Sequence, residues 1–149
     1  MESILTSIKK MLGIAEEYEH FDPDIIMHIN SVFMVLNQLG VGPEKCFFIE
    51  DKLSTWADFL DDPTDLQMVK TYIGLKVRLI FDPPASSVVM EAMKQMINEC
   101  EFRLNIAVDN GGFANGRSVK HVILTDRSTN EDYDLYVDNS NLHMNKSEG

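Results

Sequence analysis

The stretch HFDPDIIMHINSVFMVLNQLGVGP, residues 20–43, decides the fold class because it predicts one long helix with a clear start, face and end. Asp22 followed by Pro23 is typical of a helix start, with the carboxylate as N-cap and the proline in the first turn, where its missing N–H costs nothing. Gly40 stands where a helix end favours glycine. The apolar residues between them recur at helical spacing, and these residues are Ile25, Ile26, Ile29, Val32, Phe33, Leu36 and Leu39.

Four further helices are expected on either side of this one. Residues 4–12 have helical spacing and precede Gly13, while Thr55 and Asp58 resemble a capping box that opens a short helix through Trp56 and Phe59. Another helix begins at Asp62-Pro63 and ends before Asp82-Pro83-Pro84, because proline disfavours helical geometry in the residue before it. The last runs from Ser86 toward Val108. Their expected core faces are Leu66, Val69, Ile73, Val77 and Ile80 in the fourth helix, and Val89, Met93, Met96, Ile97, Cys100 and Leu104 in the fifth.

The sequence of residues 46–49 and 110–149 does not predict helices. Cys46-Phe47-Phe48-Ile49 is too apolar for a surface loop and predicts an extended segment that covers the core. After residue 109 helical spacing gives way to alternation, which predicts strands near 119–124, 133–138 and 142–144. The fold class is therefore mainly α: a small bundle of about five helices, residues 1–109, followed by a β-rich extension, residues 110–149, that forms a hairpin or a three-stranded meander. So small a sheet needs another surface against its apolar face.

The charge of the chain excludes one class of function. With 13 Lys and Arg against 24 Asp and Glu, the 149 residues have a net charge of −11 and no basic surface to bind phosphates, so autonomous nucleic-acid binding is not expected. Most of the excess lies in residues 1–109, which hold 18 acids and 9 bases. Cys46 and Cys100 lie far apart and are expected as free thiols in a reducing compartment. Nothing resembles a signal peptide or a membrane-spanning segment.

The sequence contains no catalytic signature, and we expect neither enzymatic activity nor a cofactor. One group of possible metal ligands, His20, Asp22, Asp24 and His28, surrounds the start of the 22–39 helix. We interpret Asp22 as a cap, Asp24 as favouring the helix dipole and the histidines as facing water, so no metal is expected. Trp56 is interpreted as a core residue rather than an interface anchor. Core filling is also the interpretation for most of the methionines that could otherwise line a binding groove: Met27, Met34, Met68, Met90, Met93 and Met96.

The order of these segments resembles the head–tail connector (adaptor) proteins of long-tailed bacteriophages. The resemblance covers roughly residues 1–108, and its most specific parts are residues 20–43 and LKVRLIFDPPASSVVMEAMKQMINECEFRLN, residues 75–105. It implies a structural protein that forms a ring, typically of twelve subunits, beneath the portal and joins it to the stopper or tail. Residues 123–144, ILTDRSTNEDYDLYVDNSNLHM, depart from the minimal connector pattern and are similar to short β-rich proteins encoded among phage structural genes.

The resemblance sets the leading hypothesis: a virion subunit of the neck, present in the host cytoplasm during assembly, that extends the DNA channel without binding DNA sequence-specifically or contacting a membrane. The alternative is a soluble acidic adaptor or regulator that binds a protein partner without forming a ring. The acidic residues that could face the channel are Glu16, Glu17, Glu19, Glu50, Asp51, Asp58, Asp61 and Asp62. The residues expected to contact the portal or a neighbouring subunit are Val119, His121, Ile123, Tyr133, Leu135, Val137, Leu142 and Met144.

Overall fold

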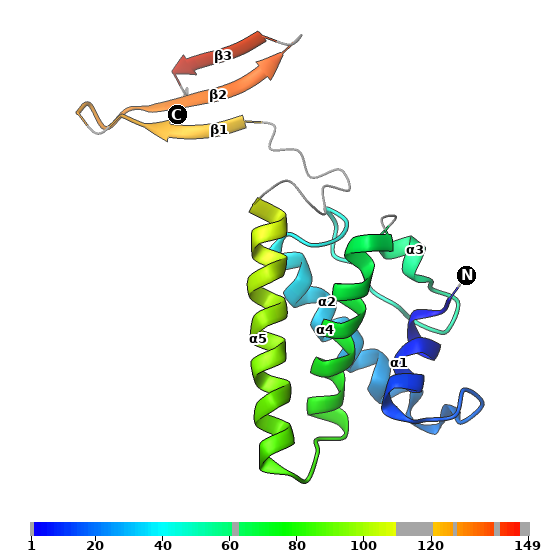
Figure 1. Cartoon of the computed structure of the whole chain (residues 1–149). Coiled ribbons are helices and arrows are strands. Elements are labelled where there is room, and N and C mark those ends of the chain that lie inside the picture. Colours follow the sequence, from blue (N-terminus) through cyan, green and yellow to red (C-terminus); the bar gives the residue numbers. More distant parts are fainter. Residues whose placement is uncertain (1, 61–62, 110–120, 127, 139–140, 147–149) are drawn as a thin grey trace. The chain divides into compact units, whose positions relative to one another are not determined.

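The computed structural model describes residues 2–60, 63–109, 121–126, 128–138 and 141–146. The chain divides into two compact units, Met1–Arg117 and Ser118–Gly149. The first, which we call the helical unit, contains all the helices of the described residues, and the second contains a small sheet (Figure 1). The predicted boundary between residues 109 and 110 falls at the edge of the described ranges.

The first two helices of the helical unit begin and end close to where the sequence predicts. Helix α1 spans Ile4–Leu12, and Gly13 ends it in the left-handed conformation at φ 78°. Helix α2 spans Asp22–Leu39, and Gly40 ends it in the same way at φ 88°. Both glycines donate their backbone N–H to carbonyls of the last turn, as helix-terminating glycines do.

The prediction that Asp22 caps α2 is wrong. A short 3₁₀ turn, η1 (Glu19–Phe21), runs directly into the helix, so Phe21 occupies the cap position and Asp22 already lies in the first turn. Its carboxylate forms an ion pair with Lys9 instead, at 2.7 Å. Pro23 does lie in the first turn, as expected.

The remaining helices complete the predicted set. Helix α3 spans Trp56–Phe59 and begins with the expected capping box of Thr55 and Asp58. Helices α4 (Pro63–Phe81) and α5 (Ser87–Asp109) are joined by the proline-containing turn. Figure 1 shows α5 running alongside α4. Helix α2 packs mainly against α4, and α1 contacts both of these helices.

The core of the helical unit is formed by one side of each helix. Segment 46–49 covers part of it as expected: Ile49 is buried, and the Phe47 ring packs against Phe33 and Phe59. The Asn30 side chain pairs with the backbone of Ile49, accepting its N–H at 2.8 Å and donating to its carbonyl at 2.9 Å. This pairing satisfies backbone groups of an extended segment that is not paired with any of the strands described. The core residues of α4 and α5 are Val69, Tyr72, Ile73, Val77, Met93, Ile97, Cys100 and Leu104.

Three residues assigned to core faces from their spacing are exposed. Ile80 is 55% exposed at the end of α4, and Val89 and Met96 are 48% and 51% exposed on α5. Helix α5 lies against the other helices on one side only, so residues at the border of its apolar face remain in solvent. The core interpretation was correct for Val69 and Ile73 of α4, which are fully buried. It was also correct for Trp56, which is 3% exposed and donates its indole N–H to Ser7 Oγ at 2.7 Å.

The second unit is the three-stranded meander, one of the two predicted alternatives. Strands β1 (His121–Thr125), β2 (Asp132–Asp138) and β3 (Asn141–Lys146) are antiparallel in the order β1-β2-β3. The β1–β2 turn is closed by Asp126, whose carboxylate accepts from the backbone and hydroxyl of Ser128. Those hydrogen bonds lower the pKa of Asp126.

Candidate assembly surfaces

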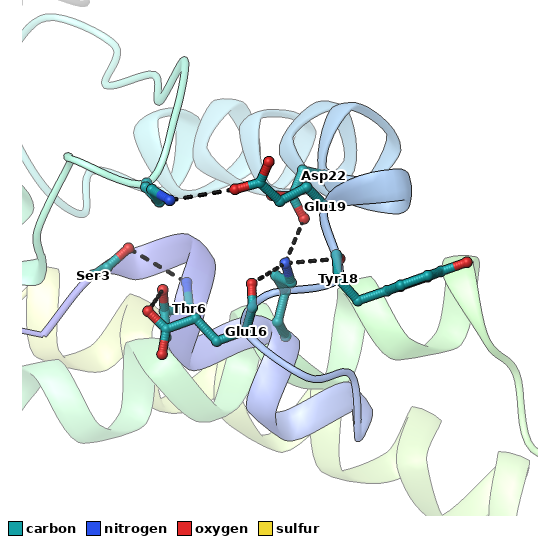
Figure 2. Close-up of polar contacts among 8 residues, drawn as sticks. Ser3, Thr6, Glu16, Tyr18, Glu19 and Asp22 are labelled. Atoms are coloured by element: carbon teal, nitrogen blue, oxygen red, sulfur yellow. Dashed lines mark hydrogen bonds and ion pairs between the residues drawn. The ribbon is translucent and has the colours of Figure 1, made fainter.

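The acidic segment between α1 and α2 is held in place by one buried lysine. The side chain of Lys9 is 2% exposed, and its ammonium group donates to the carbonyls of Glu16 at 2.9 Å and Tyr18 at 3.0 Å and pairs with Asp22. Figure 2 shows Glu16, Tyr18 and Asp22 converging around this group. The side chains of Glu16 and Glu17 remain exposed, so the segment presents carboxylates to solvent from a fixed backbone.

The structure brings together acidic residues from two separate segments, Glu19 in η1 and Glu50 and Asp51 after the extended segment. Lys52 Nζ lies 3.3 Å from Glu19 Oε1, which joins segment 50–52 to the η1 turn. Between them lies an open hollow of about 530 Å³. It is lined by Leu5, Glu19, Asp22, Pro23, Ile26, Glu50, Asp51 and Lys52. We call Glu19, Glu50 and Asp51 the acidic patch.

Another candidate channel residue, Asp58, has a different place in the structure. Asp58 accepts from the backbone N–H of Thr55 at 2.7 Å and from its hydroxyl at 2.8 Å. These two bonds, the backbone bond first, lower the pKa of Asp58, which therefore serves as a helix cap. Asp61 and Asp62 lie outside the described residues.

Most of the candidate contact residues of the sheet share one face. Residues directly opposite one another in neighbouring strands lie on the same side of a sheet, and the register pairs Leu124 with Tyr133 and Leu135 with Met144. Val137 is paired with Leu142, and this pair is two residues along each strand from the pair of Leu135 and Met144. Of the side chains described on this face, Leu142 and Met144 are 68% and 63% exposed.

In β1 the register puts the candidate contact residues in the other of the two alternating sets. His121 and Ile123 are paired with Tyr136 and Asp134, positions that alternate with the face of Leu135, and it is Val122 that stands opposite Leu135. The choice between two alternating sets in β1 rested on apolar residues present in both, so the pattern alone did not fix the phase. Val119 lies outside the described residues.

The possible metal ligands around the start of α2 do not form a cluster. No three His, Cys, Asp or Glu side chains in the described ranges are placed to hold a metal ion. The His20 ring packs against Phe21, 5.0 Å between centroids, and the His28 ring lies 6.4 Å from that of Phe81. Burial raises the pKa of the Cys100 thiol, which favours the unreactive protonated form.

The expectation that most of the methionines fill the core is wrong. Of the six considered, only Met93 is buried, whereas Met27, Met34 and Met96 are each more than half exposed. Met27 and Met34 lie two turns apart on α2 and Met96 lies on α5, so two helices present methionines to solvent. Periodicity did not reveal this, because a second apolar face has the same spacing as a core face.

Comparison with protein families identifies the helical unit. A family model described as phage connector protein matches residues 4–111, which is most of the chain and all five α-helices. The chain belongs to this family of phage connector proteins. Comparison with curated proteins and with solved structures gave no match. The connector is thus a structural protein of the phage virion at the head–tail junction. The family match ends at residue 111, before β1 begins. None of the helices in the described ranges is both long and apolar enough to cross a membrane.

Proposed function

We propose that this connector is a non-enzymatic ring subunit, typically one of twelve, that docks on the portal and continues the DNA channel toward the stopper or tail. Membership in the connector family is the observation that carries the proposal. The strong negative charge agrees with it, because a protein that surrounds DNA during packaging and ejection must not bind it tightly.

The acidic patch is the part of the helical unit best suited to face the channel. It places three carboxylates around one hollow, with Lys52 as the basic residue of that lining. At physiological ionic strength repulsion between exposed charges extends only about 8 Å. The patch would therefore act on DNA that passes close to it, and repetition around a ring would keep the duplex centred without gripping it.

The apolar face of the sheet is proposed to contact the portal or a neighbouring subunit. Leu124, Leu142 and Met144 are exposed on it, and a sheet of three strands is marginal without a covering surface. Among the strands that the structure describes, β1 and β3 are the outer ones, and outer strands are the ones open to strand addition.

Electron microscopy and native mass spectrometry of the connector mixed with purified portal test the ring. A closed ring of connector on the portal is expected. A stable complex of one or two copies bound without a ring would contradict the proposal and support an acidic adaptor instead.

Charge reversal tests the position of the acidic patch within that ring. The double variant Glu50→Lys, Asp51→Lys is expected to make portal–connector assemblies retain duplex DNA at low salt, measured by gel mobility. The matched control Glu44→Lys, Asp82→Lys changes the same charge at exposed loop positions outside the acidic patch and should leave DNA retention near that of the wild type. Equal retention by both variants would show that the patch does not face the channel.

A further inference from the structure

Helix α2 presents an uncharged face to solvent. Residues 25–43 contain no Lys, Arg, Asp or Glu, although 25% of the chain is charged and about five such residues would be expected in a stretch of this length. After Asp24 the exposed positions of α2 form one stripe. The stripe, which we call the α2 face, consists of Met27, Ser31, Met34 and Gln38.

Helix α5 has a second such face, on the side opposite the core. Its inner side is buried through Met93, Ile97, Cys100 and Leu104. The outer side, which we call the α5 face, includes Val88, Val89, Met96, Phe102 and Ile106, exposed by 77%, 48%, 51%, 65% and 43%. Near its end, Phe102 and Ile106 border an open hollow that Met68 of α4 also lines.

The charges on the α5 face cancel one another. Glu99 and Arg103 are the charged residues in its centre, and they form an ion pair in which Arg103 donates to Glu99 Oε1 from Nη2 at 2.7 Å and Nε at 2.9 Å. The α2 face and the centre of the α5 face thus have no net charge on a molecule of net charge −11, and Glu91 and Asp109 lie toward the two ends of α5. Methionine and aromatic residues together with few net charges are the composition of buried interface centres.

The occupant that best fits these faces is a second copy of the same chain. Two copies of a strongly acidic protein repel one another wherever carboxylates meet, so they can approach closely only through neutral surfaces. The helical unit presents two of these on different helices, and a ring requires two different faces that are complementary, whereas a single self-complementary face closes a dimer.

We infer that the α2 face of one subunit packs against the α5 face of the next, with Met27 and Met34 against Phe102 and Ile106. The inference rests on the proposed ring and names the surfaces that would close it. Methionine side chains are flexible enough to fill the hollow beside Phe102. The contact is heterologous, so each subunit uses one face toward each neighbour.

Two charge variants test the pairing by sedimentation velocity, alone and with portal. Phe102→Glu and Met34→Glu should each weaken self-association by about thirtyfold or more, because either places a charge in the centre of every contact. An equimolar mixture should form heterodimers, since the intact α2 face of the first variant meets the intact α5 face of the second. The control Gln67→Glu adds the same charge at an exposed position of α4 outside both faces and should assemble like the wild type.

The possible failures of this test have different meanings. If wild-type protein forms no oligomer alone or on the portal, the proposed ring is wrong and the interface with it. If wild type assembles but Phe102→Glu and Met34→Glu assemble equally well, only this interface is overturned. Loss of association in Phe102→Glu alone, or a mixture without heterodimers, would overturn the heterologous pairing. Unchanged circular dichroism of each variant confirms that it is folded.

Discussion

Lys9 is the residue on which the placement of the acidic segment depends. Its ammonium group is buried and has three oxygen partners, from Glu16, Tyr18 and Asp22. Lys9→Met keeps the aliphatic volume but leaves a mostly buried carboxylate and two carbonyls without this donor. Removing one partner of a buried pair costs about 3–5 kcal/mol. Since Asp22 retains 17% exposure, urea denaturation should show a free energy of unfolding lower by about 3 kcal/mol. Lys10→Met, at an exposed neighbour, should change stability by less than about 0.5 kcal/mol. Similar midpoints for both variants would contradict the role of Lys9.

Tyr72 makes the stability of the helical unit sensitive to alkaline pH. Its hydroxyl donates to Glu101 Oε1 at 2.6 Å, and Lys76 Nζ lies 3.3 Å from the same oxygen. Burial first, and then the bond to Glu101, raises the pKa of Tyr72 above its ordinary value. The folded state therefore holds the phenol proton more tightly than the unfolded state, so this stabilisation is complete below the unfolded pKa of about 10 and is lost as pH rises above it.

The variant Tyr72→Phe isolates this contribution. At pH 8 it should lower the free energy of unfolding by about 1–2 kcal/mol, since the charged acceptor loses a hydrogen bond. Above about pH 10 the wild type should lose stability faster than the variant, so the difference between them narrows. Urea titrations at pH 8 and pH 10.5 measure the difference in free energy of unfolding between the wild type and the variant. The same difference at both pH values would contradict the role of Tyr72 in alkaline sensitivity.

At the scale of elements, the turn after α2 depends on a glycine for two reasons. Gly42 has a φ of 90°, and a Cβ built there would lie 2.4 Å from a ring atom of Phe59 in α3. Gly13 has a similar φ of 78° but open space around the corresponding position. Left-handed backbone costs a non-glycine residue about 1–2 kcal/mol, and forcing an extra methyl into a packed site adds about 1–3 kcal/mol. Gly42→Ala should therefore destabilise clearly more than Gly13→Ala in urea denaturation; equal costs would mean that Phe59 moves aside freely.

The ends of most helices were predictable because capping residues lie within a few positions of them. The burial of a helix face was not, because buried and exposed apolar faces have the same spacing in the sequence. Gly13, Gly40 and the Thr55–Asp58 capping box mark helix ends within a few residues of sequence, and each lies where it was expected. Asp22 has the same local pattern, yet it pairs with Lys9 thirteen positions earlier, a contact no spacing rule contains. Val89 and Met96 have core spacing and are exposed, since periodicity does not say what a face packs against.

The sequence identified the residues of the acidic patch but not which of them lie close together. Glu19 and Glu50 are both recognisable as parts of acidic runs, but their meeting across one hollow depends on Lys52 and on the path of the chain over α2. Asp58 belongs to the same run and lies in a helix cap instead. The charge-free run 25–43 was the one sequence signal that could have indicated an interface on α2.

At the scale of the whole molecule, folding and assembly are expected to be separable. The buried core residues described in the helical unit lie between Ile4 and Leu104, within the first compact unit. A chain ending at Arg117, the last residue of the first compact unit, should therefore unfold cooperatively with the same urea midpoint as the helical signal of the full chain.

The affinity of this shortened chain for portal, or for further copies of itself, should fall by about tenfold or more, because the exposed apolar face with Leu142 and Met144 is removed. The variant Leu142→Glu, Met144→Glu in the full chain should reproduce that loss, whereas His143→Glu, at the intervening position of β3, should not. Full affinity of the shortened chain would confine assembly to the helical unit and remove the sheet from the connector's contacts.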